Sequence, residues 1–323
     1  MSKILVTGGA GFIGAHLVKE LLARGDEVVI VDDFNNRYDP KLKEARVSEL
    51  LPDFPTDVLI REDVSDAEAM AKVFANHKFD AVVHLAAWAA VQRSIDEPLT
   101  YSNANINGTI VMLEEARKHN VKNFVFASSS SVYGGREEMP LSETDDVSKP
   151  ISPYAATKVA GEALCATWNY LYDLPISAVR FFTVYGPWGR PEMALFKFTE
   201  AIEEGRTIEM RGSETKRDFT FIDDIVQGLL GAIDNPPAGY EIYNLGNQDA
   251  VPLPRFIKAI EAALDKKATI TDVPLPPGDV PQTLADISKA KERLGYKPTT
   301  SIEEGVKKFV SWYQDWYLPN FRK

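Results

Sequence analysis

The sequence predicts an α/β fold in which a doubly wound parallel sheet is followed by a smaller α+β part. Up to about residue 182, short apolar runs alternate with helical patterns, and this alternation is typical of right-handed strand–helix–strand units. The runs are apolar throughout, as expected for strands that helices cover on both faces. From about residue 183 the alternation weakens and Pro and Gly become frequent, which indicates a second, smaller part.

Each predicted element rests on its apolar pattern. Strands are predicted at Lys3–Thr7, Glu27–Asp32, Val58–Arg61, Ala81–Leu85, Asn123–Ser128 and Ser177–Phe182. Helices are predicted at Gly11–Arg24, Asp66–His77, Leu99–His119, Pro153–Tyr172, Met193–Glu204, Leu253–Leu264 and Ser301–Trp316. The stretch Arg217–Ile233 is interpreted as a strand and helix that return to the first domain. We therefore predict two discontinuous domains, residues 1–182 with about 217–245, and residues 183–216 with 246–323.

Composition restricts the classes of partner. The 323 residues are 45% hydrophobic, which is enough for a full core, and their net charge of −11 argues against nucleic-acid or anionic-membrane binding. The single cysteine, Cys165, cannot form an internal disulfide and fits a reducing compartment. We find no signal-peptide pattern, no apolar run long enough to span a membrane and no metal-ligand spacing among the four histidines. A cytoplasmic protein without a metal is expected.

A glycine-rich turn, TGGAGFIG (Thr7–Gly14), separates the first predicted strand from the first helix. Gly8, Gly11 and Gly14 have the spacing of a dinucleotide-binding turn, in which glycine lets the backbone approach a pyrophosphate. The following helix presents free N–H groups and its positive dipole end to the phosphates. The turn taken alone is also compatible with a simple strand–helix connection. Its position after a strand predicts a Rossmann domain.

Acidic residues end the next strands. Asp32 and Asp33 follow the glycine turn by about twenty residues, where a carboxylate can accept hydrogen bonds from the cofactor ribose. An acid there repels a 2′-phosphate, so NAD is favoured over NADP. Asp63 and Val64 are candidates for the adenine edge, although an ordinary turn before the helix at Asp66 explains them nearly as well.

Tyr154 and Lys158 stand four residues apart in a helix that Ser152 and Pro153 begin. A phenol with a pKa of ~10 is a poor base at neutral pH. A nearby ammonium and an oxidised nicotinamide lower that pKa, which makes Tyr154 a candidate proton acceptor. A Y-x-x-x-K pair by itself more often marks a solvated helix face, but the upstream glycine turn favours the catalytic interpretation.

The run SSSSVYG (Ser128–Gly134) directly follows the core strand. Open α/β sheets bind ligands at the carboxyl ends of their strands, so a serine there can hydrogen-bond a reacting oxygen opposite Tyr154. The run is therefore interpreted as part of a site rather than as a flexible linker.

These motifs, together with HLAA (His84–Ala87), resemble the extended short-chain dehydrogenase/reductases of the NAD-dependent epimerase/dehydratase family, over essentially the whole chain. The narrower resemblance is to the UDP-glucuronate 4-epimerases. It is carried by the stretches Asp32–Leu51, Arg180–Thr199, Arg217–Gly228, Tyr243–Asn247 and Lys307–Tyr317.

The resemblance implies bound NAD and a nucleotide-sugar-binding second domain. Tyr154 would remove the proton of the sugar 4-hydroxyl while C4 gives its hydride to NAD⁺, the 4-keto sugar would rotate, and hydride return would invert C4. By position, Ser129 matches the catalytic Ser/Thr and Lys158 the partner of the tyrosine. Family members are commonly dimers that pair the helices at 99–119 and 153–172, so a homodimer is expected.

The resemblance also implies two sets of binding residues. The cofactor set is Gly8, Gly11, Phe12, Ile13, Gly14, Asp32, Asp33, Asn35, Asp63, Val64, Leu85, Ala86, Ala87, Asn105, Tyr154, Lys158 and Phe181. The substrate set is Ser129, Ser130, Ser131, Thr183, Arg190, Ala194, Phe196, Arg217 and Asp279. Within it, Arg190 is a candidate for the uronate carboxylate or for ordering its own loop, and Arg217 for the UDP diphosphate.

The serine run distinguishes the related reactions. Similar decarboxylases usually read T-S-E, with Glu where this chain has Ser131, and many dehydratases read D-E within the run. A dehydratase needs an acid to protonate the departing hydroxyl. A 4-keto uronic acid loses CO₂ readily, so an epimerase must hold its carboxylate in a geometry that prevents loss. Neutral hydroxyls of Ser130, Ser131 and Thr183 can do so.

The sequence departs from the uronate epimerases at one segment. AAVQRS (Ala89–Ser94) replaces the more usual A-G-V-R, and Trp88 precedes it. These departures leave alternatives: a UDP-glucose or UDP-N-acetylglucosamine 4-epimerase, a UDP-glucuronate decarboxylase, or a non-enzymatic NAD-sensing scaffold. A scaffold of that kind commonly lacks the tyrosine or the lysine, and this chain has both.

Overall fold

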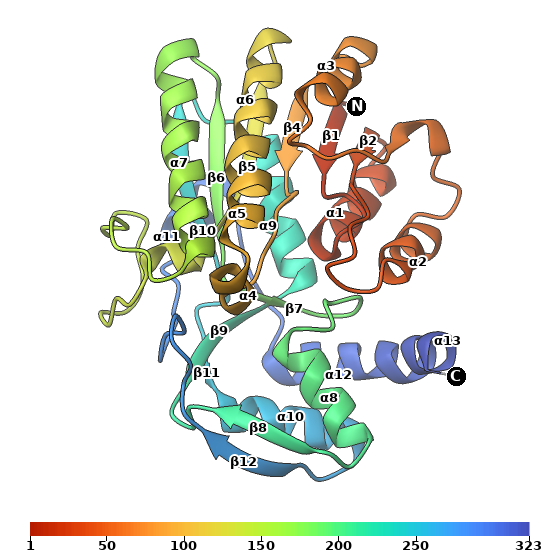
Figure 1. Cartoon of the computed structure of the whole chain (residues 1–323), viewed down its shortest axis with the longest axis vertical. Helices are drawn as coiled ribbons and strands as arrows, with labels where there is room; N and C mark the ends of the chain where they lie inside the picture. The colour runs from red at the N-terminus through yellow and green to blue at the C-terminus, as the bar shows by residue number, and fades with distance from the viewer. Residues whose placement is uncertain (323) are drawn as a thin grey trace.

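The computed structural model describes residues 1–322, and its larger part is built on a parallel sheet of seven strands (Figure 1). The strand order is β10-β6-β5-β4-β1-β2-β3. The strands are β1 (Lys3–Thr7), β2 (Glu27–Val31), β3 (Leu59–Ile60), β4 (Ala81–His84), β5 (Asn123–Ser129), β6 (Ile176–Phe181) and β10 (Tyr240–Leu245). Every neighbouring pair in this sheet is parallel. The predicted doubly wound α/β fold is confirmed.

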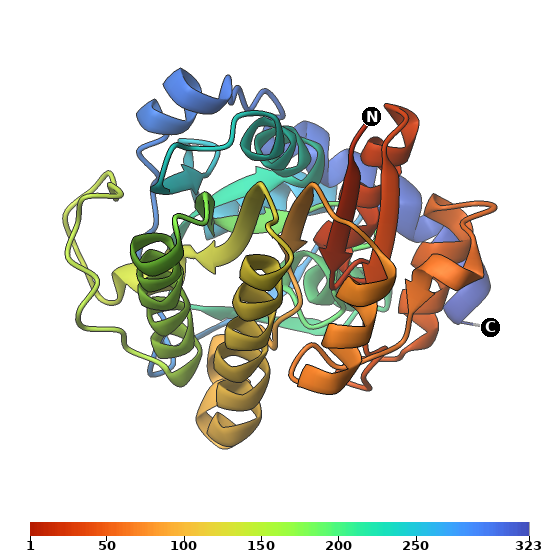
Figure 2. The ribbon, with the colours of Figure 1, turned by 90° about the horizontal axis from the view of Figure 1, so that it is seen from above.

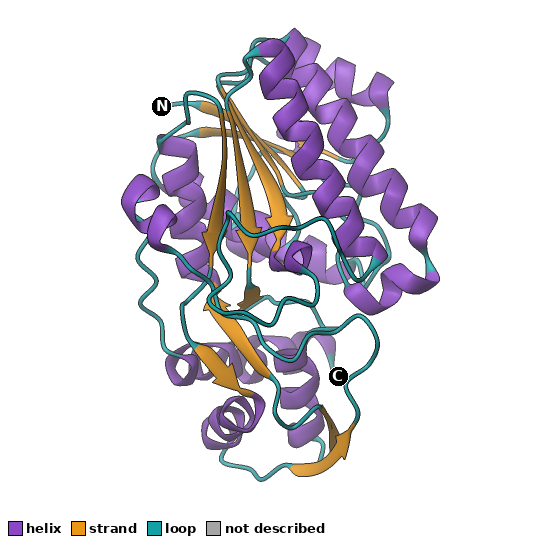
Figure 3. Cartoon of the chain, turned by 90° about the vertical axis from the view of Figure 1, so that its left-hand side faces the viewer, coloured by secondary structure: helices purple, strands orange, loops and turns teal. Residues whose placement is uncertain are grey.

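Helices cover both faces of this sheet (Figures 2 and 3). One layer contains α3 (Ala67–Asn76), α6 (Gly108–Lys118) and α7 (Pro153–Tyr172), and the other contains α1 (Phe12–Ala23) and α9 (Ile222–Asp234). Alternate strand residues supply the two cores: Ile4 and Val6 pack with α1, whereas Leu5 packs on the α3–α6 side. Both faces are apolar, which explains why the strand sequences show no alternation.

The second part lies beyond the carboxyl ends of the main strands (Figure 1). It contains a three-stranded sheet of β7 (Thr183–Tyr185), β9 (Lys216–Phe221) and β11 (Ala250–Pro252), and a pair formed by β8 (Thr207–Arg211) and β12 (Thr269–Val273). Its helices are α8 (Ala194–Glu203), α10 (Leu253–Leu264), α12 (Ile302–Trp312) and the short α13 (Leu318–Phe321).

The stretch Arg217–Ile233 divides between the two parts. Its helix, α9, packs beside α1 under the main sheet as predicted, but its strand, β9, pairs with β7 and β11. The strand of this stretch therefore belongs to the smaller three-stranded sheet and not to the seven-stranded sheet. The exact domain boundaries stay a prediction.

Several further elements differ from the prediction, among them the strands β7, β8, β10, β11 and β12, which were not predicted. Helix α2 (Lys41–Leu50) was not predicted because the residues it buries include Lys43 and Arg46, so no apolar stripe marks it. The short α4 (Val91–Asp96) and α11 (Ser288–Leu294) were also not predicted. The predicted helix at 99–119 consists of α5 (Pro98–Ser102), one π-helical turn (Asn103–Asn107) and α6. A π turn inside a helix often accompanies a functional site.

Helix α7 is seated closely on strands β5 and β6. Gly161 touches the sheet, since a Cβ there would lie 2.3 Å from Cζ of Phe126. The next residue, Glu162, accepts two hydrogen bonds from the Arg180 guanidinium at 2.8 and 2.7 Å and one from the Ser128 hydroxyl at 2.5 Å. All three polar residues are buried. The first serine of the SSSSVYG run therefore anchors a helix.

No helix within residues 1–322 is both long enough and apolar enough to cross a bilayer.

We predict that Glu162→Gln lowers the free energy of unfolding by about 3 kcal/mol, because it leaves the buried Arg180 guanidinium without its counter-charge. Urea unfolding of the variant and the parent protein measures this change. The matched control is Glu303→Gln, which breaks an exposed pair with Arg255 and should cost less than about 1 kcal/mol. Equal losses for the two variants would contradict a special role for the buried pair.

Candidate active site

The glycine turn forms a cradle that only glycine can line. Gly8 has a φ of +69°, and its N–H donates to the Val31 carbonyl at 2.7 Å. A Cβ at Gly14 would lie 2.2 Å from the Gly8 carbonyl oxygen. No side chain caps helix α1 at Gly11, so the first-turn N–H groups, including those of Phe12 and Ile13, have no side-chain acceptor. These are the groups that bind phosphate at a helix N-terminus.

The segment after β4 passes directly over this turn. The N–H of Leu85 donates to the Thr7 carbonyl at 3.1 Å, and the N–H of Ala86 donates to the Thr7 hydroxyl at 3.2 Å. A Cβ at Gly8 would lie 2.8 Å from the Ala86 nitrogen. The predicted cofactor residues Leu85, Ala86 and Ala87 thus begin beside the glycine cradle, although they are far from it in sequence.

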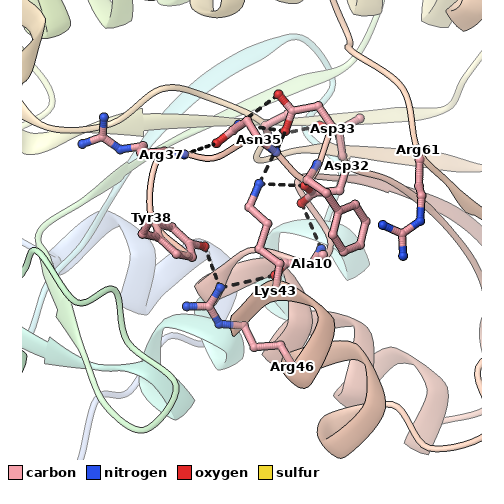
Figure 4. Close-up of polar contacts among 12 residues, drawn as sticks. Ala10, Asp32, Asp33, Asn35, Arg37, Tyr38, Lys43, Arg46 and Arg61 are labelled. Carbon is pink, nitrogen blue, oxygen red and sulfur yellow. Dashed lines mark hydrogen bonds and ion pairs between the residues drawn. The ribbon is translucent and has the colours of Figure 1, made fainter. Parts of the chain in front are cut away.

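Asp32 directly follows β2, and its buried carboxylate accepts three hydrogen bonds (Figure 4). It accepts hydrogen bonds from the Ala10 N–H at 3.1 Å, the Phe34 N–H at 2.9 Å and the Lys43 ammonium at 2.9 Å. Lys43 is buried and also lies 3.4 Å from Asp33. Lys43 therefore offsets the negative charge of this strand end, and charge repulsion alone no longer explains a preference for NAD over NADP.

The remaining predicted cofactor residues lie around this edge. Asn35 donates its side-chain amide to the Asp33 carboxylate at 2.7 and 2.9 Å. Asp63 accepts the Ser65 N–H at 2.8 Å, which forms a local turn. Val64 is buried against Gly108 of α6, and Phe181 is buried at the end of β6.

Asn105 lies in the π-helical turn and is buried. Its amide accepts the Trp88 N–H at 2.8 Å and donates to the Trp88 carbonyl at 3.0 Å and to the Thr157 hydroxyl at 2.9 Å. These contacts tie the loop after β4 to helix α7. Because the structure shows Asn105 positioning other residues, its direct contact with a cofactor stays a prediction.

Lys158 points into the protein beneath Tyr154. It is buried, its ammonium donates to the Ala127 carbonyl at 2.7 Å, and it lies 5.2 Å from the centre of the Phe126 ring. Burial lowers the pKa of Lys158 from its ordinary value of 10.5 to about 8. The ammonium lies 5.9 Å from the centre of the Tyr154 ring, so the predicted pair is adjacent but not directly hydrogen-bonded.

Burial raises the pKa of the Tyr154 phenol. Three other groups lower this pKa. The largest effect is a hydrogen bond with Ser129, followed by the positive charges of Arg190 and then Arg37. The sequence predicted that Lys158 and the nicotinamide would lower this pKa. Lys158 is not among the groups that lower it in the structure, where two guanidinium groups from other segments of the chain do so instead.

The serine run changes direction at its second member. Ser129 ends β5 and caps the 3₁₀ turn Ser130–Tyr133. Its hydroxyl accepts hydrogen bonds from the Ser131 N–H at 3.2 Å and from the Ser131 hydroxyl at 2.9 Å. Ser129, Ser130 and Ser131 are all partly exposed, unlike Ser128. The three hydroxyls predicted to contact substrate are therefore accessible.

Four predicted substrate residues meet in one cavity. Thr183, Arg190, Ala194 and Phe196 line it, together with Phe12 from the glycine turn. The Phe196 ring also packs edge-to-face on Tyr317 at 4.7 Å, so it belongs to the core as well as to the cavity. The sequence separates these residues by up to 184 positions, and the fold brings the two parts of the chain together here.

Arg190 belongs to a cluster that sequence motifs did not mark. The Glu192 carboxylate lies 3.3 Å from Arg190 Nη1 and 3.5 Å from Arg37 Nε. Arg37 also donates to the Tyr101 hydroxyl at 3.1 Å, and the Tyr101 and Tyr154 rings meet edge-to-face at 6.2 Å. Arg37 lies in the Asp32–Leu51 stretch and Tyr101 in the predicted helix at 99–119, but neither was predicted as a site residue, and only their contacts near Tyr154 reveal them.

The two departures from the uronate epimerase pattern contact each other. The guanidinium groups of Arg37 and Arg93 lie 5.7 and 5.5 Å from the Trp88 ring centre, within cation–π range. Arg190 donates to the Ala89 carbonyl at 2.9 Å, next to this indole. The unusual Trp88 thus precedes the residue whose carbonyl accepts a hydrogen bond from Arg190.

Arg217 and Asp279 lie close enough to affect each other's charge. Burial lowers the pKa of Arg217 and raises that of Asp279, and each residue opposes the shift of the other. Among the described residues, the Arg217 guanidinium makes only one hydrogen bond, from Nη1 to the carbonyl of its neighbour Lys216. This free guanidinium suits an anionic ligand.

Among residues 1–322, no group of three or more His, Cys, Asp or Glu side chains is placed to hold a metal ion. His84 is buried and hydrogen-bonded to the Thr7 hydroxyl at 2.8 Å, and burial lowers its pKa to about 3.

A glycine cradle at the first helix, an acid at the end of the second strand and a tyrosine–lysine pair beside the fifth strand define an enzyme of the extended short-chain dehydrogenase/reductase class. The family described as GDP-mannose 4,6 dehydratase matches residues 5–309. The chain belongs to this family of NAD-dependent nucleotide-sugar epimerases and dehydratases.

Individual relatives make the resemblance more specific. UDP-glucuronate 4-epimerase 1 of Arabidopsis thaliana is 46% identical, over 98% of this chain and 77% of the relative. The Bacillus cereus UDP-glucuronic acid 4-epimerase, solved with UDP-glucuronic acid and NAD, superposes with a TM-score of 0.91 at 34% identity, covering 97% of this chain and 99% of that chain. The Thermotoga maritima UDP-glucose 4-epimerase, solved with UDP-glucose, has a TM-score of 0.87 at 32% identity over the same shares.

We predict that the Lys158→Met variant has a larger free energy of unfolding than the parent protein at pH 7, by up to about 3 kcal/mol. The same variant should lose turnover. Because the folded-state pKa lies below that of an unfolded lysine, the unfolded chain binds this proton more tightly. Lys158 therefore lowers the free energy of unfolding of the parent protein by its full amount below pH 8, and this destabilisation disappears as the pH rises towards 10.5. Denaturant unfolding of NAD-free protein between pH 7 and pH 10 measures it.

The control for this variant is Lys307→Met at an exposed position of α12, which should change stability by no more than about 0.5 kcal/mol at any pH. A stabilisation by Lys158→Met that stays constant up to pH 10 would contradict the predicted titration.

Proposed function

We propose that this protein is a UDP-glucuronate 4-epimerase that interconverts UDP-glucuronate and UDP-galacturonate. The observation that carries the proposal is the make-up of the site facing Tyr154. Ser129 ends β5, Ser130 and Ser131 begin the 3₁₀ turn that follows it, and Thr183 and Arg190 line a cavity at the start of the second part. The serine run contains no carboxyl group where related decarboxylases and dehydratases carry one.

The chain's own residues perform the proton chemistry. Tyr154 takes the proton from the sugar 4-hydroxyl, and Ser129 hydrogen-bonds the oxygen at C4. Lys158 remains buried beneath the phenol and adds positive charge near it. Bound NAD supplies the hydride acceptor and then the hydride donor at C4. Arg190 and Arg37 stabilise the phenolate, because both act against the burial of Tyr154.

The carboxylate of the uronate lies between Arg190 and the hydroxyls of Ser130, Ser131 and Thr183. A guanidinium holds the carboxylate in a defined plane by charge-assisted hydrogen bonds. Holding the carboxylate in this way keeps the β-keto acid intermediate from losing CO₂. The free guanidinium of Arg217, with Asp279 nearby, binds the UDP diphosphate end.

A neutral UDP-hexose 4-epimerase is the second candidate. The similarity to the Thermotoga maritima UDP-glucose 4-epimerase supports it, as does the Trp88 segment, which departs from the uronate pattern. The absence of an acid in the serine run argues against a decarboxylase, and the intact Tyr154–Lys158 pair argues against a non-catalytic NAD-sensing scaffold.

We also propose a cytoplasmic homodimer. Large apolar side chains are exposed on the helices expected to pair, with Leu99 of α5 at 84% and Tyr170 of α7 at 86%. A second copy that pairs these helices would cover them. The single cysteine, Cys165, is buried and free, which suits a reducing compartment.

The proposed activity is tested by incubating the purified protein with UDP-glucuronate, UDP-glucose, UDP-N-acetylglucosamine and their C4 epimers, and by following the products by NMR. We expect UDP-galacturonate from UDP-glucuronate without added NAD. The Tyr154→Phe variant serves as the control for catalysis and should lose turnover. Formation of CO₂ and a UDP-pentose as the main products, or epimerisation of neutral hexoses only, would overturn the proposal.

Arg190→Ala should lower kcat/KM for UDP-glucuronate by about 10- to 100-fold, because it removes a charge-assisted hydrogen bond worth about 1.5–3 kcal/mol. UDP-glucose lacks the carboxylate, so its kcat/KM should fall only by the smaller effect of losing positive charge near Tyr154, at most about threefold. Steady-state kinetics with both sugars measures the difference. Equal losses on both sugars would show that Arg190 acts through Tyr154 or its own loop and does not bind the carboxylate.

A further inference from the structure

Arg46 is a buried cation that the proposed chemistry does not use. Its side chain is completely buried on helix α2. Within residues 1–322, no carboxylate lies within the 4 Å of an ion pair with its guanidinium. Burying a charge without a counter-ion is expensive, and such a residue is replaced at little cost by an apolar one unless its hydrogen bonds are needed.

The hydrogen bonds of Arg46 connect three separate segments. Its Nε and Nη2 donate to the Trp188 carbonyl at 3.0 and 2.8 Å, and Nη2 also approaches the Gly189 carbonyl at 3.5 Å. Its Nη1 donates to the Tyr38 hydroxyl at 2.6 Å and, over 3.4 Å, to the Ala10 carbonyl (Figure 4). One guanidinium thus joins the glycine turn to the loop that precedes Arg190.

This loop is held in a conformation that a bulky residue rarely adopts. Trp188 has a φ of +64°, which is costly for a residue with a side chain. Its indole is buried and packs on Trp316 at 4.1 Å and Trp312 at 5.2 Å. The aromatic contacts hold the side chain, and the two hydrogen bonds from Arg46 hold the carbonyl. Together they keep the peptide in its strained orientation.

The held peptide lies two residues before Arg190. From there the chain turns once more, and the Met193 N–H donates to the Arg190 carbonyl at 3.1 Å. The guanidinium of Arg190 then reaches the Ala89 carbonyl at 2.9 Å. If the 188–189 peptide rotated, the Cα atom of Arg190 would move, and the Arg190 guanidinium would move with it.

We propose that Arg46 is a positioning residue, which sets the location of Arg190 relative to the glycine turn by holding the Trp188 and Gly189 carbonyls. This proposal rests on the proposed role of Arg190 at the substrate carboxylate. It predicts that the geometry of the substrate loop depends on a residue that itself touches no substrate. The planar fork of arginine reaches acceptors on two sides at once, which the single ammonium of lysine cannot do.

The test is a double-mutant cycle of Arg46→Lys and Arg190→Ala with UDP-glucuronate. Arg46→Lys alone should raise KM about tenfold and change kcat little, because it displaces the carboxylate-binding guanidinium of Arg190 while Ser129 and Arg37 still oppose the effect of burial on the pKa of Tyr154. In the Arg190→Ala background the same change should have less than about a twofold effect, since the two residues act through one contact. The matched control is Arg255→Lys at an exposed helix position, which should leave KM unchanged.

A second readout needs no substrate. Amide hydrogen exchange of residues 185–193 should accelerate in Arg46→Lys, while exchange in β4 and β5 stays as in the parent protein. If Arg46→Lys does not fold, Tyr38→Phe replaces it, because this variant removes one acceptor of the same guanidinium. It should give a smaller KM increase that again disappears in the Arg190→Ala background.

Additive effects in the cycle, unchanged exchange of residues 185–193, or faster exchange with an unchanged KM would each overturn the role of Arg46. These outcomes are separable from failure of the proposed function. If the parent protein does not convert UDP-glucuronate, the uronate assignment fails, whereas the exchange experiment still decides whether Arg46 holds the loop.

Discussion

The seating of helix α7 on strands β5 and β6 is the constraint on which the rest of the site depends. Gly161 allows the helix to touch Phe126, and the buried Glu162–Arg180 pair with Ser128 locks its position along the strands. Tyr154, Lys158 and Glu162 follow one another at four-residue intervals on this helix, so the same face carries both the anchor and the chemistry. Because both partners of the ion pair are buried, displacement of the helix would leave a charge unpaired.

Buried positive charges gather near the carboxyl edge of the main sheet, on the side where the second part of the chain begins. Lys158, Lys43 and Arg46 are all buried, and each binds groups from more than one segment or faces a strand end. Such groups reduce stability unless their hydrogen bonds are complete. These groups lie at the carboxyl edge of the sheet, where parallel strands end and ligands bind. The stability lost by burying their charges therefore concerns the site and not the apolar core.

Much of the fold was predictable because its signals are local. The first six strands of the main sheet, the glycine turn and helix α7 each depend on a pattern within about twenty residues, and all appear where the sequence places them. The failures have a common cause. Helix α2 buries charged residues, and β9 pairs with strands 30 residues away or more. Each of these elements depends on contacts with residues that are distant in the sequence, which a local pattern does not indicate.

The sequence by itself determined the doubly wound fold, the likeness to NAD-dependent epimerases and the lack of an acid in the serine run. These properties depend on residue type and short-range spacing, which a linear chain states directly. Only the tertiary structure decided that Ser128 anchors α7, that the charges of Arg37 and Arg190 lower the pKa of Tyr154, and that Arg46 joins the glycine turn to the Arg190 loop. The reason is physical: hydrogen bonds and charges act over a few ångströms in space, and only folding sets those distances.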